Sequence, residues 1–105
     1  MIMANWTKES VREALLAKDE NVWRGTVMLY RRQTRSEQEQ MHSTQKNGVG
    51  FNKRDAKFMT SLAEQIIRNR NRGYRYLLTE RQTEYARRII WKYAGQLARI
   101  ANGEL

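Results

Sequence analysis

Residues 47–65 read NGVGFNKRDAKFMTSLAEQ, a glycine-bearing turn followed by an amphipathic segment. Asn52 stands where a helix N-cap is expected, because its side chain can accept a hydrogen bond from a first-turn N–H. Asp55 follows three residues later and can complement the helix dipole. Phe51 precedes the cap and can pack against Ala56 as a hydrophobic staple. The residues predicted to fix how this helix enters the core are Gly48, Gly50, Phe51, Asn52 and Asp55.

The predicted helix runs from about residue 53 to residue 68. At 100° per residue, apolar side chains fill one half of it and polar side chains the other. The apolar half consists of Phe58, Met59, Leu62, Ala63, Ile66 and Ile67. The segment is therefore predicted to be a core helix.

The Gly48-Val49-Gly50 turn before this helix permits a second interpretation, a cradle of backbone N–H groups for a phosphate. The full GxxxxGK[ST] pattern is missing, however, and no predicted strand precedes the turn. We therefore prefer the capping interpretation.

Helical segments are also predicted on both sides of this stretch. One runs from an N-cap at Thr7 to about Lys18, and the next from about residue 20 to 33. A capping box that begins at Thr34 predicts a short polar helix at 35–41, followed by a mobile polar loop at 42–50. Thr79 and Gln82 form a further capping box, which predicts one long helix over 80–101.

The expected fold is all-α, a compact bundle of four main helices plus one short polar helix. A length of 105 residues indicates one domain, residues 1–105. Gly25 lies inside the predicted second helix, where glycine costs roughly 1 kcal/mol against alanine. It either permits close contact between helices or is merely tolerated.

The positive charge is concentrated in the second half of the chain. The sequence has 20 Lys and Arg against 11 Asp and Glu, a net charge of +9. Residues 1–52 have 8 basic and 6 acidic side chains (+2), and residues 53–105 have 12 and 5 (+7). A basic half favours polyanionic partners, nucleic acid first. The alternative is that the charge serves only solubility.

The composition argues against enzymatic chemistry. There is no cysteine and one histidine, His42 in the polar loop, which we interpret as a solvated side chain. The carboxylates are too scattered for a two-metal site. We expect no catalytic residue, metal or cofactor. We also expect no signal peptide and no membrane span, because the opening MIMANW lacks a basic region and no segment has ~20 apolar residues. The default expectation is a soluble protein of the cytoplasm.

The stretch RNRNRGYRY at residues 68–76 combines four arginines with two tyrosines around a glycine. Arginine forks match phosphates bidentately, and tyrosine faces stack on bases. A basic loop at about residues 68–78 is therefore a candidate contact surface for nucleic acid. The alternative is a solvated connection between helices whose tyrosines pack into the core.

The predicted last helix also has a basic face. Its basic side chains fall within about 40° of each other by the 100° rule, opposite an apolar arc. They are Arg81, Arg88, Lys92 and Arg99. Trp91 lies off the apolar arc, where it either anchors an interface or stacks on a base, or else packs under the first helix. The residues predicted to bind nucleic acid or a protein partner are Arg68, Arg70, Arg72, Tyr74, Arg75, Tyr76, Arg81, Arg88, Trp91, Lys92 and Arg99.

Three blocks of the sequence together resemble a small module of bacteriophage and prophage proteins. They are LYRRQT followed by EQ at 29–38, NGVGFN with DA and SLAEQ at 47–65, and LTERQ with AR and KYAGQL at 78–97. The resemblance spans about residues 15–103. Such modules occur as stand-alone proteins and attached to phage-type helicases, and the loop at 68–76 is longer and more basic here than is usual. The resemblance implies a phage or mobile-element origin, a bacterial host cytoplasm and an association with helicases, but no catalytic residues.

We therefore expect a non-catalytic phage accessory protein that binds nucleic acid, DNA rather than RNA, through the basic loop and the basic helix face. The alternative is a phage protein that binds a host defence or replication factor and inhibits or redirects it. In that case Trp91, Tyr74 and Tyr76 are the anchors, and the arginines meet an acidic surface.

Overall fold

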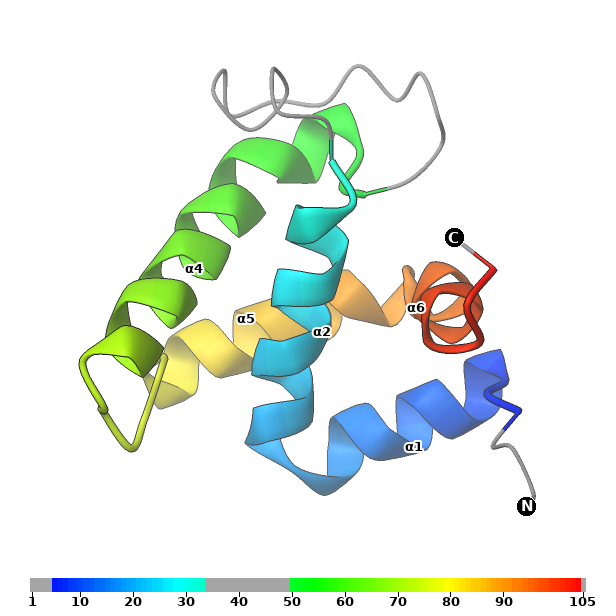
Figure 1. Ribbon diagram of the computed structural model, residues 1–105, viewed down its shortest axis with the longest axis horizontal. Helices are drawn as coiled ribbons and strands as arrows, with labels where there is room; N and C mark the ends of the chain where they lie inside the picture. Colours follow the sequence, from blue (N-terminus) through cyan, green and yellow to red (C-terminus); the bar gives the residue numbers. More distant parts are fainter. Residues whose placement is uncertain (1–4, 34–49, 105) are drawn as a thin grey trace.

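The computed structural model describes residues 5–33 and 50–104, and every regular element in these ranges is a helix (Figure 1). The helices are α1 (Lys8–Ala17), α2 (Asp19–Arg31), α4 (Lys53–Asn71), α5 (Glu80–Trp91) and α6 (Ala94–Ala101). The predicted all-α class is confirmed. The predicted polar helix at 35–41 and the predicted loop at 42–49, with His42 and Gly48, lie outside the described residues.

Three helices begin at the polar residues that the capping patterns indicated. The Thr7 hydroxyl accepts from the N–H of Ser10 at 3.1 Å, and the Ser10 hydroxyl accepts from the N–H of Thr7 at 2.9 Å. Asn52 caps α4 through its side-chain oxygen. Thr79 and Gln82 form the reciprocal capping box of α5, with distances of 3.1 and 3.0 Å. Each box satisfies N–H groups that have no partner inside the helix.

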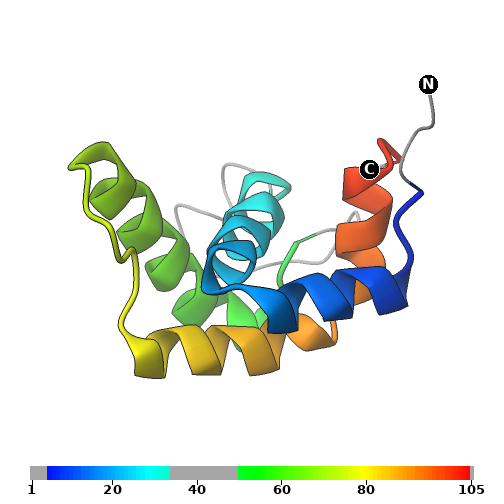
Figure 2. The same ribbon diagram turned by 90° about the horizontal axis from the view of Figure 1, so that it is seen from below.

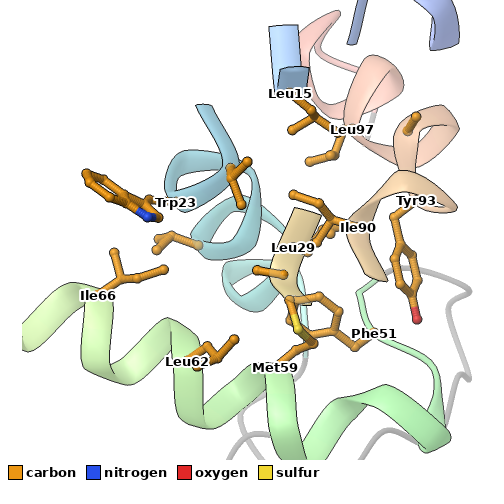
Figure 3. Close-up of a cluster of buried hydrophobic side chains, with 14 of the residues drawn as sticks. Leu15, Trp23, Leu29, Phe51, Met59, Leu62, Ile66, Ile90, Tyr93 and Leu97 are labelled. Carbon is orange, nitrogen blue, oxygen red and sulfur yellow. The ribbon is translucent and has the colours of Figure 1, made fainter. Parts of the chain in front are cut away.

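Helix α2 lies at the centre of the fold and contacts all four of the other described helices (Figure 1). Figure 3 shows Leu29 of α2 close to Phe51, Met59 and Ile90, which come from the segment before α4, from α4 and from α5. All four side chains are fully buried. The core therefore joins elements from both halves of the sequence.

Gly25 lies on the side of α2 that faces α5 and α6. A Cβ atom at this position would lie 3.4 Å from Cδ1 of both Ile90 and Leu97. This is the tight limit of ordinary contact, so the absence of a side chain lets the helices lie close together. The structure favours close helix contact over mere tolerance of this glycine.

The predicted single helix over residues 80–101 is divided at Lys92 and Tyr93. Helix α5 ends at Trp91, α6 begins at Ala94, and the two point in different directions (Figure 1). Tyr93 was predicted to continue the apolar arc of this helix. Its side chain is buried, and its hydroxyl instead bonds to the N–H of Asn52 at the start of α4. Helix α6 packs its own apolar side against α1. Apolar periodicity continues through the break, which is why the sequence suggested one helix.

Helix α4 differs from the prediction at two points. It continues to Asn71, so Arg68 and Arg70 belong to its last turns and not to a loop. Phe58 was predicted to lie in the core, but 44% of its surface is exposed. Its ring instead contacts Tyr85 of α5 edge-on, with centroids 6.3 Å apart. Phe58 lies at the edge of the apolar face of α4, where its ring packs against Tyr85 of α5 instead of pointing into the core.

The turn into α4 is fixed by a network of hydrogen bonds with the segment after α5. The Tyr93 hydroxyl accepts from the N–H of Asn52 at 2.9 Å and donates to Oδ2 of Asp55 at 2.8 Å. The N–H of Gly50 donates to Oε1 of Gln96 at 2.9 Å, and the φ of Gly50 is +93°. Burial raises the pKa of Tyr93 well above its ordinary value, and the bond to Asp55 adds to this effect. The predicted cap is thus present, and it is braced by Tyr93, which lies 41 positions after the cap residue Asn52.

The two ends of the described chain are joined by a pair of reciprocal hydrogen bonds. The N–H of Trp6 donates to Oδ1 of Asn102 at 2.8 Å, and Nδ2 of Asn102 donates to the carbonyl of Trp6 at 2.9 Å. Helices α1 and α6 also contact each other directly. The first and last described helices therefore form one side of the molecule.

Candidate nucleic-acid interface

The end of α4 and the segment that follows it form a well-anchored projection. Gly73 has a φ of +77°, and the N–H of Tyr74 donates to the carbonyl of Asn69 at 3.0 Å, which closes the helix with a left-handed residue. Nδ2 of Asn69 donates to the carbonyl of Leu77 at 3.0 Å. Leu77 and Leu78 are buried. Figure 2 shows this segment crossing from the end of α4 to the start of α5.

The predicted basic residues of this segment face the solvent. Tyr74 is 53% exposed and Tyr76 is 68% exposed, so the alternative in which the tyrosines pack into the core is wrong. All the arginines of this segment are exposed: Arg68, Arg70, Arg72 and Arg75. None of them forms an ion pair with an acidic side chain of the described residues. Their charges are therefore available to a ligand.

Arginine and tyrosine also interact within the segment. The guanidinium of Arg75 lies 5.5 Å from the centroid of the Tyr76 ring. This distance is within the range of a cation–π contact. The arrangement presents a positive charge and an aromatic ring side by side, as the interleaved sequence suggested.

An open hollow of about 450 Å³ separates this segment from the first half of α2. Its basic and aromatic lining includes Arg24, Arg70, Arg75 and Tyr74. The remaining lining residues are Glu20, Trp23, Gly73 and Leu77. Three arginines against one glutamate give the hollow a net charge of +2. Arg24 was not among the predicted site residues, because only the packing of α2 beside the end of α4 brings it there.

The exposed side of α5 forms a second surface with arginine and aromatic side chains, and its two arginines are balanced by two glutamates. Arg81 and Arg88 are both exposed, as predicted, and Tyr85 lies between them with 54% of its surface exposed. A shallow depression is lined by Glu80, Arg81, Glu84, Tyr85 and Arg88. Tyr85 was missed by the sequence analysis. Its spacing of four residues from Arg81 and three from Arg88 places it on their face of the helix and was the signal available.

The basic stripe predicted along residues 81–99 does not continue past α5. Lys92 forms an ion pair with Asp55, with Nζ 2.7 Å from Oδ2, and this pair belongs to the network at the start of α4. Arg99 is exposed on α6, where its Nε lies 3.9 Å from a carboxylate oxygen of Glu104. The break at residues 92–93 turns α6 away from α5. The prediction of one continuous stripe is therefore wrong.

Trp91 packs against the first helix, which was one of the alternatives left open. The guanidinium of Arg12 lies 5.0 Å from its ring centroid and also donates two hydrogen bonds to the Trp91 carbonyl, at 3.2 and 3.3 Å. The ring is partly buried against the core. Trp91 is thus engaged with α1 and is not a free stacking platform.

Arg87 shows by contrast what a structural arginine looks like in this fold. Its guanidinium bonds to the carbonyl of Leu15 at 2.8 Å, to Asp19 at 2.6 Å and to Glu84. Only 13% of its side chain is exposed. It ties α5 to the junction of α1 and α2, whereas no ion pair ties the arginines at the end of α4 to another part of the described chain.

Two kinds of site are not found in the part of the chain that the structure describes. No group of three or more His, Cys, Asp or Glu side chains there could hold a metal ion. No helix among these residues is long and apolar enough to span a bilayer. Comparison with known proteins gives no match to a family model, to a curated protein or to a solved structure.

Proposed function

We propose that this protein is a non-catalytic nucleic-acid-binding domain whose contact surface is the end of α4 and the segment that follows it. One observation carries the proposal: four arginines without ion-pair partners among the described residues share an anchored projection with two exposed tyrosines. Solubility alone does not require the charges to be clustered, because positive charge spread evenly over the surface would have the same effect. Concentration of unpaired arginine and exposed aromatic rings on one segment is typical of nucleic-acid contact.

Phosphates supply most of the affinity in this proposal. Arginines contact them without reading the sequence, so binding is governed by counterion release. If about four arginines each neutralise one phosphate of a single strand, the logarithm of the affinity falls with a slope of about −2.8 against the logarithm of the salt concentration. Affinity should then fall about 50-fold between 50 and 200 mM salt.

Fluorescence anisotropy with labelled DNA and RNA oligonucleotides, titrated at several salt concentrations, tests the proposal. The double variant Arg70→Gln/Arg75→Gln should weaken binding and flatten the slope by about 1.4, which is 0.7 for each lost contact. The matched control is Arg54→Gln/Lys57→Gln, which removes the same charge from the exposed first half of α4. Absence of binding, affinity that ignores salt, or equal losses in both variants would contradict the proposal.

The resemblance to phage modules adds a cellular setting to the proposal. In that setting the protein acts in the bacterial cytoplasm as a phage accessory protein, with DNA as the expected partner, alongside a helicase. Co-purification with DNA rather than RNA from infected cells would support this setting.

A protein partner is the second candidate function, and the surface of α5 is the observation that favours it. Phe58 and Tyr85 form an exposed aromatic pair beside Arg81 and Arg88. Aromatic residues and arginine are the residue types that dominate binding energy at protein interfaces. Pull-down from host lysate with and without nuclease separates the two functions. A stoichiometric protein that survives nuclease and is lost with Tyr85→Ala would favour the second.

A further inference from the structure

The hollow between α2 and the end of α4 brings together groups that suit one nucleotide. It combines Arg24 of α2 with Arg70 and Arg75 and with the ring of Tyr74. These side chains come from elements about 46 residues apart in sequence, so the hollow is a product of the fold. Its volume of about 450 Å³ falls within the range of small-ligand sites in proteins.

We propose that this hollow binds one unpaired nucleotide, so that the protein prefers single-stranded nucleic acid over a blunt duplex. The inference rests on the proposed function and assigns the class of nucleic acid. The phosphate lies among the three guanidinium groups, and the base stacks on Tyr74. A base inside a duplex is stacked on both faces and has none to offer, whereas an unpaired base can be turned onto an aromatic side chain.

The electrostatics of the hollow also favour one phosphate rather than several. None of the three arginines forms an ion pair within residues 5–33 and 50–104, so each fork is available to phosphate oxygens. Glu20 lies in the same hollow and repels further phosphates. As an acceptor beside the arginines, its carboxylate can take a hydrogen bond from an N–H group of the base, such as N3–H of thymine.

The backbone of Tyr74 is fixed, and its ring is exposed for stacking. The N–H of this residue is bonded to the carbonyl of Asn69, which fixes the backbone, while more than half of the side chain remains exposed. With the backbone already ordered, only the two side-chain torsions of Tyr74 remain to be fixed when a ligand binds. Tyr74 is therefore predicted to supply the preference for single strands, whereas Arg24 strengthens contact with the phosphate.

The test compares a labelled dT12 strand with a labelled blunt duplex of two complementary 12-nucleotide strands, by anisotropy at one salt concentration and at equal phosphate concentration. The wild-type protein should bind the single strand about tenfold more tightly. Tyr74→Leu should lose this preference while its affinity for the duplex stays within about twofold. Tyr74→Phe keeps the ring and should retain the preference. Arg24→Gln should weaken binding to dT12 about fivefold, which is about the loss of one phosphate contact.

Arg54→Gln is the matched control, because it removes an arginine about 24 Å away from Arg70 along α4. Circular dichroism and thermal unfolding confirm that each variant is folded. Salt-dependent binding with no preference for dT12, or a Tyr74→Phe variant that behaves like Tyr74→Leu, overturns this inference and leaves the proposed function standing. Absence of binding to either probe overturns both.

Discussion

Replacing Tyr93 by phenylalanine removes a single oxygen atom from the junction of α4 and α5, and we expect it to destabilise the fold by about 3 kcal/mol. The hydroxyl accepts from the N–H of Asn52 and donates to the carboxylate of Asp55. The variant leaves a partly buried N–H without its acceptor, which costs about 1–3 kcal/mol, and removes a hydrogen bond to a charged group, worth about 1.5–3 kcal/mol. Asp55 keeps its ion pair with Lys92, which limits the loss.

The aromatic ring is retained in this variant, so the packing term should change little. Phe51 contacts the Tyr93 ring edge-on, with centroids 5.6 Å apart, and phenylalanine preserves that contact. Urea unfolding followed by circular dichroism measures the difference. Tyr85→Phe is the control, because its ring is exposed and the substitution should change the unfolding free energy by less than about 0.5 kcal/mol. A loss in Tyr93→Phe no larger than in this control would refute the reasoning.

The stability difference between the wild type and Tyr93→Phe should also depend on pH. The pKa of Tyr93 is raised in the folded state, so the native protein keeps the phenol proton after the unfolded chain has lost it. The stabilisation is complete below the unfolded pKa, about 10, and falls as the pH rises toward the folded pKa. By pH 11 the wild-type advantage over Tyr93→Phe should narrow by about 1.4 kcal/mol. If the unfolding free energies of the wild type and of Tyr93→Phe changed in parallel from pH 8 to 11, the pKa of Tyr93 would not be raised in the folded state, and the prediction would be wrong.

Three further pairs of substitutions test other parts of the structure. Gly50→Ala should lower the free energy of unfolding by more than about 2 kcal/mol, because φ is +93° and a Cβ would lie 2.5 Å from Cγ of Gln33. Gly73→Ala should lower it by only about 1 kcal/mol, because φ is +77° but the space around the position is open. Urea unfolding measures both values. Thr79→Ala should lose about 1 kcal/mol through the capping box of α5, and Thr79→Ser should recover most of it. Arg87→Met should lose about 2 kcal/mol by thermal unfolding, because it removes the side-chain donor to the partly buried carbonyl of Leu15. Arg88→Met should be neutral for stability. Equal effects within any of these pairs would count against the corresponding contact.

Local signals in the sequence were sufficient to predict where most helices begin. Thr7, Asn52 and Thr79 act through neighbours three residues away, so a short window contains all the information. The exposure of the arginines and tyrosines at 68–76 could also be predicted from a short window, because charged and polar residues surround a glycine there. The end of α4 was misplaced because Asn69 to Asn71 could equally well continue or end a helix.

The features that were missed depend on contacts distant in sequence. Tyr93 leaves the helical path because its hydroxyl satisfies Asn52 and Asp55 about 40 positions earlier, and no pattern around residue 93 shows this. Arg24 enters the hollow through the packing of α2 against its neighbours. Phe58 turns outward because Tyr85 stands opposite it. Periodicity assigns a side chain to a face, but the partner on that face is a property of the whole fold.

The pairing of α1 with α6 has a consequence for how the protein is made. The ribosome releases α1 before any other described helix, and the surface that covers it is synthesised last. Until then the apolar side of α1, with Val11 and Leu15, has only part of its final partners. Contacts between segments so far apart form slowly, because a long loop must close first. The nascent chain is therefore expected to remain incompletely folded, and open to chaperones and proteases, until Asn102 emerges to bond with Trp6.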